Sequence, residues 1–181
     1  MDIMKFYEMK SFYILTDIKE HNENKQKFLS LIDKMPQSSL EGISKTDWNL
    51  PKEQKREYLD YFYQLITPYM NEMSKQLKCK TWNIDNGWFQ IYGKEDTHGW
   101  HTHQKSNYTN VYYLHLPDNT MKTEVYDVTN NTIINDFNVK EGQILTFSAG
   151  TIHRSPVNLT NENKIVIAFN SNFAYVDLTI S

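Results

Sequence analysis

The segment Gly-Trp-His-Thr-His at residues 99–103 carries two histidines one residue apart, and a third lies about fifty positions later in Ala-Gly-Thr-Ile-His-Arg-Ser-Pro at 149–156. On a β-strand, residues i and i+2 point to the same side, so His101 and His103 can coordinate the same metal ion. His153, on a distant strand, would be the third ligand. Three protein ligands leave coordination positions open, as a catalytic metal site requires, whereas a structural zinc site is closed by four. The pattern predicts a metalloenzyme.

The residues around these histidines are typical of short strands separated by turns. Strands are predicted at 81–84, 88–92, 109–116, 122–128, 131–138, 143–148 and 164–170. The turn Asp85-Asn86-Gly87 is predicted to join the first two of them as a hairpin. The 12 Tyr, 9 Phe and 4 Trp favour strands and half-buried surfaces. Many short strands after a helical block indicate a mainly β protein with N-terminal helices, built as a β-barrel or jelly roll.

Residues 22–78 have helical periodicity. The first helix has one apolar stripe that ends at Pro36, formed by Phe28, Leu29, Ile32 and Met35. A second helix is predicted to begin with Asn49 as its cap and Pro51 in its first turn, and to kink or break at Pro68. We expect a single domain, 1–181, in which a helical N-terminal layer (1–79) packs on a β core (80–181).

Composition narrows the class of protein further. With a net charge of −3, the chain lacks the excess of basic residues that is typical of proteins that bind nucleic acid. No run approaches the roughly twenty apolar residues that a membrane span needs, and the N-terminus does not read as a signal peptide. The lone Cys79 excludes an internal disulfide and fits a reducing compartment. These features predict a soluble, cytoplasmic protein without a membrane partner, and they leave the oligomeric state open.

Two longer stretches resemble a known family. The runs Trp-Phe-Gln-Ile-Tyr-Gly-Lys (88–94), Trp-His-Thr-His (100–103) and Ser-Asn-Tyr-Thr-Asn-Val-Tyr-Tyr-Leu (106–114) are similar to the first half of an iron(II)/2-oxoglutarate-dependent oxygenase, especially the small ones encoded by phages and bacteria. The segment from Glu141 to Asn170 resembles the closing strands of that family, and Lys-Thr-Asp-Trp at 45–48 is similar to its phage members. The resemblance covers roughly residues 86–171 and implies a prolyl-hydroxylase-like double-stranded β-helix. It also implies oxidation of a substrate, such as hydroxylation, with Fe(II), dioxygen and 2-oxoglutarate, in the host cytoplasm if the chain is phage-encoded.

The resemblance also assigns roles to residues. His101 and His103 fall on the family's His-x-Asp/Glu motif and His153 on its distal histidine, so these three would bind the metal. Tyr113 falls where prolyl-hydroxylase-like members use a tyrosine to hydrogen-bond the cosubstrate. Lys164 falls near the arginine that grips the distal carboxylate of 2-oxoglutarate, a task that lysine performs as a point charge. With His103 in place of the usual carboxylate, the site would consist of three neutral imidazoles.

Other residues near the motif are assigned less central places. Four are candidates for the mouth of the pocket: Trp88, Gln90, Tyr92 and Trp100. His98 is expected to be solvent-exposed or else to lie next to a metal ligand, with exposure favoured, and His115 is left out of the site. Arg154, next to a ligand on a strand, is expected to point away from the metal.

Two other interpretations of the same predicted barrel are possible. The spacing of Gly142, Gly150 and His153 also fits the second motif of the cupins, among which three-histidine metal sites occur, but no glycine lies six residues before His101. The third reading is a barrel that has lost catalysis and serves as a binding or virion-associated module. The sequence does not identify the substrate, which could be a protein side chain, a nucleotide, a lipid or a small metabolite.

Overall fold

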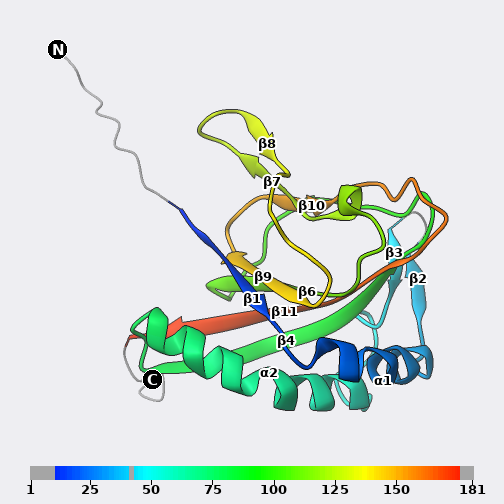
Figure 1. Cartoon of the computed structure of the whole chain (residues 1–181), viewed down its shortest axis with the longest axis horizontal. Helices are drawn as coiled ribbons and strands as arrows, with labels where there is room; N and C mark the ends of the chain where they lie inside the picture. Colours follow the sequence, from blue (N-terminus) through cyan, green and yellow to red (C-terminus); the bar gives the residue numbers. More distant parts are fainter. Residues whose placement is uncertain (1–10, 41–42, 176–181) are drawn as a thin grey trace.

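Two antiparallel sheets face each other in the computed structural model, which describes residues 11–40 and 43–175 (Figure 1). The larger sheet has the order β1-β9-β6-β11-β4-β3-β2, and the smaller one β5-β10-β7-β8. The strands of the larger sheet are β1 (Tyr13–Asp17), β9 (Gln143–Ser148), β6 (Tyr108–His115), β11 (Lys164–Ala174), β4 (Thr81–Tyr92), β3 (Ser44–Thr46) and β2 (Ser38–Leu40). Those of the smaller sheet are β5 (His98–His101), β10 (His153–Ser155), β7 (Glu124–Asp127) and β8 (Thr132–Ile134). The predicted mainly β fold with N-terminal helices is confirmed.

Two helices, α1 (His21–Asp33) and α2 (Glu57–Gln76), cover the face of the larger sheet that points away from the smaller one (Figure 1). The prediction that α2 begins at Asn49 is wrong, because residues 47–56 form turns whose carbonyls accept hydrogen bonds from Arg56. The helix does not break at Pro68. Packing against the sheet holds one continuous helix, because buried residues lie on both sides of the proline. These buried residues are Tyr58, Leu59, Phe62, Ile66, Met70, Met73 and Ser74.

The predicted hairpin at residues 81–92 is also wrong. These residues form one strand, β4, which pairs with β11 from Thr81↔Ala174 to Tyr92↔Lys164. Asp85 is absorbed by a register shift between Asn170 and Ser171 on the partner strand, so no turn is needed. The glycine at position 87 has a packing role instead, because a Cβ there would lie 2.4 Å from the Tyr63 hydroxyl of α2.

The alternation of side chains along β6 separates two apolar cores. Tyr112 and Leu114 point toward the helices and join Phe28, Phe62 and other residues in the larger core. Val111 and Tyr113 point between the sheets and belong to a second core. The space between the sheets continues from this second core into the cavity described below.

The segment 1–79 is not purely helical where the structure describes it. β1 adds to β9 at one edge of the larger sheet, and the β2–β3 pair extends the opposite edge next to β4. These strands are short, with three to five residues each, and lack the clear alternation that signals a strand. None of the helices in the described residues is long and apolar enough to span a bilayer.

Candidate metal centre

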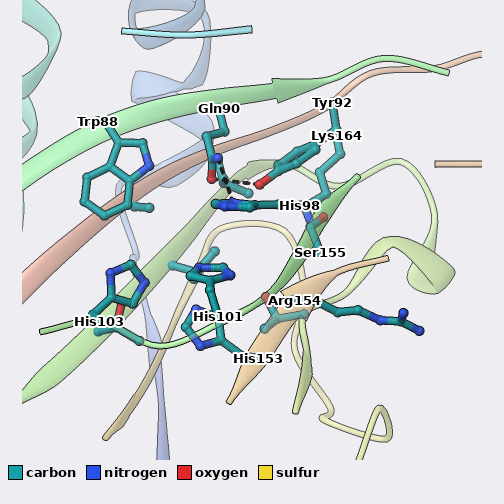
Figure 2. Close-up of a pocket in the computed structure, with 15 residues that line it drawn as sticks. Trp88, Gln90, Tyr92, His98, His101, His103, His153, Arg154, Ser155 and Lys164 are labelled. Carbon is teal, nitrogen blue, oxygen red and sulfur yellow. Dashed lines mark hydrogen bonds between the residues drawn. The ribbon is translucent and has the colours of Figure 1, made fainter. Parts of the chain in front are cut away.

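The three histidines of the predicted site lie together between the sheets. His101 is the last residue of β5, His103 follows it by two residues, and His153 begins β10 opposite His101. One ring nitrogen from each lies within 4.8 Å of those of the other two. Figure 2 shows the three rings turned toward one another on one side of a cavity. His101 and His153 face each other on paired strands, as predicted. His103 lies two residues beyond the end of β5, so strand alternation does not place it. Its backbone N–H donates to the carbonyl oxygen of Ala149, which holds it beside the other two.

Hydrogen bonds fix which ring nitrogen is free in two of these histidines. His101 Nδ1 lies 2.7 Å from the carbonyl oxygen of Gly99, and His153 Nδ1 lies 2.8 Å from that of Thr151. A carbonyl oxygen only accepts hydrogen bonds, so each Nδ1 carries the proton and donates it. Each Nε2 therefore keeps a free lone pair, which is the form that binds a metal ion.

Burial keeps these imidazoles neutral. Desolvation lowers the pKa of His153 to about 3 and that of His103 to about 4, and it also lowers the pKa of His101. Neutral imidazole suits Fe, Zn, Cu and Ni. The donor set therefore fits a divalent transition metal ion that keeps open coordination positions.

The cavity next to the histidines lies between inward-facing residues of β4, β6 and β11 and residues of the smaller sheet, ten of which are labelled in Figure 2. It is lined by Trp88, Gln90, Tyr92, His98, His101, His103, Thr109, Val111, Thr123, His153, Arg154, Ser155, Lys164, Val166 and Ala168. Three of the four residues predicted at the mouth are among them. The fourth, Trp100, has the opposite orientation on β5 to His101 and lies on the outer side, packed against Tyr126 and under Arg154.

Lys164 is the most unusual residue of this cavity, because its side chain is only 2% exposed. Its Nζ donates to the carbonyl oxygen of Met121 and the hydroxyl of Ser155, both at 2.7 Å, and lies 4.7 Å from the centre of the Tyr92 ring. It makes no ion pair with any described residue. Within the part of the chain that the structure describes, no carboxylate lines the cavity. A buried ammonium without a counterion is costly, so this position fits an anionic group of a ligand.

Tyr113 lies behind Lys164 rather than in the cavity wall. Its ring centre is 5.9 Å from Lys164 Nζ, and its hydroxyl bonds the Thr123 hydroxyl at 2.7 Å and accepts from the Thr123 N–H. The tyrosine hydroxyl that reaches the cavity lining is that of Tyr92, which donates to Gln90 Oε1 at 2.7 Å. Tyr113 thus supports the wall next to the lysine, with its hydroxyl already engaged.

His98 is part of the cavity and lies beside a predicted ligand, which is the less favoured of the two places that the sequence left open for it. Its ring stacks on that of His101 with centroids 4.1 Å apart, and its Nδ1 lies 3.2 Å from Gln90 Nε2. The register between β5 and β10 shifts by one residue between the pairs His101↔His153 and His98↔Ser155, so residues three apart share one face. The sequence offers no signal for such a bulge, and strict alternation places His98 on the wrong side.

The other two predictions, which concern His115 and Arg154, agree with the structure. His115 lies outside the cavity, where it contacts Glu141 and Lys25. Arg154 extends away from the histidines (Figure 2) and pairs with Glu124, with 2.6 Å between Nε and Oε2.

The burial of Lys164 predicts a pH dependence of stability in the protein without ligands. Desolvation lowers the pKa of this lysine to about 7 from the ordinary 10.5. Between these values the unfolded chain binds a proton that the folded chain does not, so the free energy of unfolding rises with pH by at most roughly 1.4 kcal/mol per unit. Below pH 7 both states are protonated and the full cost of the buried charge is present. Urea unfolding from pH 6 to 9 should show this rise in the wild type relative to Lys164→Met, and parallel curves would contradict it.

Comparisons with known proteins support the fold. No protein-family model and no curated protein sequence matches the chain. Among solved structures, the viral collagen prolyl hydroxylase of Paramecium bursaria Chlorella virus-1, in complex with 2-oxoglutarate, is 19% identical with a TM-score of 0.59, over 91% of this chain and 96% of that one. A 2-oxoglutarate–Fe(II) oxygenase family protein from Burkholderia pseudomallei is 11% identical, with a TM-score of 0.67 over 90% of this chain and 86% of that one.

HygX from Streptomyces hygroscopicus, solved with nickel and 2-oxoglutarate bound, is 10% identical, with a TM-score of 0.63 over 90% of this chain and 83% of that one. At these identities the similarity concerns the backbone arrangement. The chain therefore has the double-stranded β-helix fold of the 2-oxoglutarate-dependent oxygenases.

Proposed function

We propose that this chain is an Fe(II)- and 2-oxoglutarate-dependent oxygenase that oxidises its substrate by a hydroxylase-type reaction. One observation carries the proposal: a single cavity holds three clustered neutral imidazoles and a fully buried lysine that has no counterion among the described residues. A metal ion accounts for the imidazoles, and a carboxylate accounts for the lysine. The similar structures from Paramecium bursaria Chlorella virus-1 and Streptomyces hygroscopicus bind 2-oxoglutarate in the same fold.

The residues would divide the work as follows. His101, His103 and His153 hold the iron, with the Nδ1–H groups of His101 and His153 anchored on backbone carbonyls. Lys164 pairs with the distal carboxylate of 2-oxoglutarate, and the ring of Tyr113 lies behind the lysine with its hydroxyl held by Thr123. Iron, 2-oxoglutarate and dioxygen together supply the oxidising chemistry when bound.

The remaining lining residues shape and dry the site. Trp88 is 5% exposed and its ring lies 5.8 Å from that of His103, so it shields the metal side of the cavity from water. The Tyr92 hydroxyl is held by Gln90 Oε1, and Gln90 Nε2 in turn contacts His98. This chain of contacts fixes the side chains opposite the metal, and a preorganised wall of this kind orients a bound substrate.

The all-histidine ligand set has an electrostatic consequence. Three neutral imidazoles leave the charge of a divalent ion uncompensated by protein, and Lys164 adds a further positive charge. An anionic cosubstrate is then the main source of negative charge in the cavity. Iron and 2-oxoglutarate should therefore strengthen each other's binding, since a coupling between two ligands is reciprocal.

The test is anaerobic addition of Fe(II) followed by titration with 2-oxoglutarate. The wild type should bind one iron and then develop a metal-to-ligand charge-transfer band in the visible range. His153→Ala should lose iron binding because a coordinating nitrogen is gone. His115→Ala is the matched control, because this histidine lies outside the cavity and its loss should leave both steps intact.

Other outcomes would favour the alternatives. Iron binding without any response to 2-oxoglutarate would indicate a cupin-type three-histidine metalloenzyme, which the all-histidine donor set also fits. No iron binding at all would indicate a barrel that serves as a binding or virion-associated module. Either result would overturn the proposed oxygenase activity.

A further inference from the structure

His103 differs from the other two histidines in what its Nδ1 faces. Where His101 and His153 donate to backbone carbonyls, His103 Nδ1 lies 3.4 Å from the amide nitrogen of Asn170 on β11. That amide nitrogen also donates to Asn86 Oδ1 at 2.9 Å. An amide nitrogen cannot accept a proton, so in this orientation the Nδ1 of His103 is an acceptor and its Nε2 carries the hydrogen. A protonated Nε2 cannot bind a metal ion.

The other end of the same amide is unsatisfied. Asn170 is 3% exposed, and its Oδ1 is buried without a hydrogen-bond partner among the described residues. A half-turn of the amide exchanges oxygen and nitrogen with no other change in shape. The oxygen then faces His103 Nδ1 and can accept its hydrogen, which frees Nε2 as in His101 and His153.

Asn86 makes the half-turn possible. With the Asn170 oxygen turned inward, two amide oxygens would meet unless Asn86 turns as well and offers its nitrogen. Asn86 is exposed and its amide has no other hydrogen bond with the described residues, so this rotation costs little. The two asparagines face each other in register on β4 and β11.

We propose that Asn170 is a positioning residue for the metal site, whose amide oxygen selects the metal-binding tautomer of His103 with the help of Asn86. The inference rests on the metal site of the proposed function. Residues that hold a histidine ligand through its second nitrogen typically contribute about 10- to 100-fold to metal affinity. His103 is the only member of the cluster that depends on a side chain for this hold, because the other two use backbone carbonyls.

Binding of Ni²⁺ to the purified protein, measured by calorimetry, tests this with three variants. Asn170→Leu removes the acceptor and should weaken binding roughly 10- to 100-fold. Asn170→Asp restores an acceptor that needs no half-turn and should bind at least as tightly as the wild type. Asn86→Asp should weaken binding, because its carboxylate draws the Asn170 nitrogen toward itself and keeps that nitrogen beside His103.

Asn86→Asp also separates this effect from simple electrostatics. If a nearby negative charge were all that mattered, both aspartate variants would tighten Ni²⁺ binding. Opposite effects of the two variants are expected from the hydrogen-bond arrangement, and a gain in both would overturn it. Asn86 is at the surface, so its variant is expected to fold even if Asn170→Leu does not.

A spectroscopic measurement reads the tautomer without any metal. Nitrogen-15 NMR of the metal-free wild type at neutral pH should show His103 protonated at Nδ1, as for His101 and His153, and Asn86→Asp should shift it toward Nε2. An unchanged tautomer in Asn86→Asp would overturn the inference. A wild type with the expected tautomer but no affinity for metal would instead count against the proposed function.

Discussion

Replacing Lys164 with methionine is expected to weaken 2-oxoglutarate binding by at least about 30-fold, because removing one partner of a buried charge pair typically costs about 2–5 kcal/mol. The lysine is buried, and no other cation of the described residues points into the cavity. Its two protein partners, the Met121 carbonyl and the Ser155 hydroxyl, are neutral and cannot compensate its charge. Titration of the anaerobic Fe(II) protein, followed by the charge-transfer band, measures the effect.

The same variant should be more stable than the wild type when no ligand is present. Methionine is close to lysine in length and needs no counterion, so it removes the cost of burying an ammonium group. The two lost hydrogen bonds offset part of this gain, and a net increase of about 1–3 kcal/mol in the free energy of unfolding is expected at pH 7. A residue that destabilises the protein without ligand, and whose cost is removed when the ligand binds, is typical of a binding site rather than of a residue that maintains the fold.

Arg154→Met provides the matched control for the anion. Arg154 is the other cation next to the cavity, but it pairs with Glu124 and covers Trp100 on the outer side. Its loss should leave 2-oxoglutarate affinity nearly unchanged. If Arg154→Met weakened binding while Lys164→Met did not, the assignment of Lys164 would be wrong.

The sequence predicts the part of the site that depends on strand alternation. On β11, alternate residues from Lys164 to Ala168 line the cavity, while Ile165 and Ile167 contact the helix-side core. The same alternation on β4 brings Trp88, Gln90 and Tyr92 to the cavity. Regular strands repeat every two residues, so a correct strand assignment places their side chains.

The sequence-based predictions are wrong where the backbone departs from this two-residue repeat, or where residues distant in the sequence determine the local conformation. The Asp85-Asn86-Gly87 segment has the composition of a turn, yet pairing with the long strand β11 keeps it extended. His98 reaches the cavity only because of the register shift on β5. The start of α2 is displaced to Glu57 by side-chain bonds from Arg56, which no local pattern reveals.

Replacing Asp47 with alanine is expected to cost about 3–5 kcal/mol of stability, because it leaves a partly buried arginine without its counterion. Asp47 is fully buried. Its Oδ2 accepts from Arg56 Nε at 2.9 Å and from the Tyr58 hydroxyl at 2.6 Å, and its Oδ1 accepts from the Phe89 N–H at 3.0 Å. One carboxylate thus joins the 47–56 turns, the first turn of α2 and strand β4. Chemical denaturation would measure the loss.

Lys55→Ala is the control for this variant, since Lys55 forms an exposed ion pair with Glu57 in the same region and its removal should change stability little. The Asp47→Ala protein should still bind Fe(II) at low temperature, because Asp47 contacts the backbone of Phe89 from outside the cavity. Loss of iron binding by a folded Asp47→Ala protein would instead place this carboxylate in the site. The contacts of Asp47 make this carboxylate a structural link, because it holds the strand whose neighbouring residues, Trp88 and Gln90, form the cavity wall.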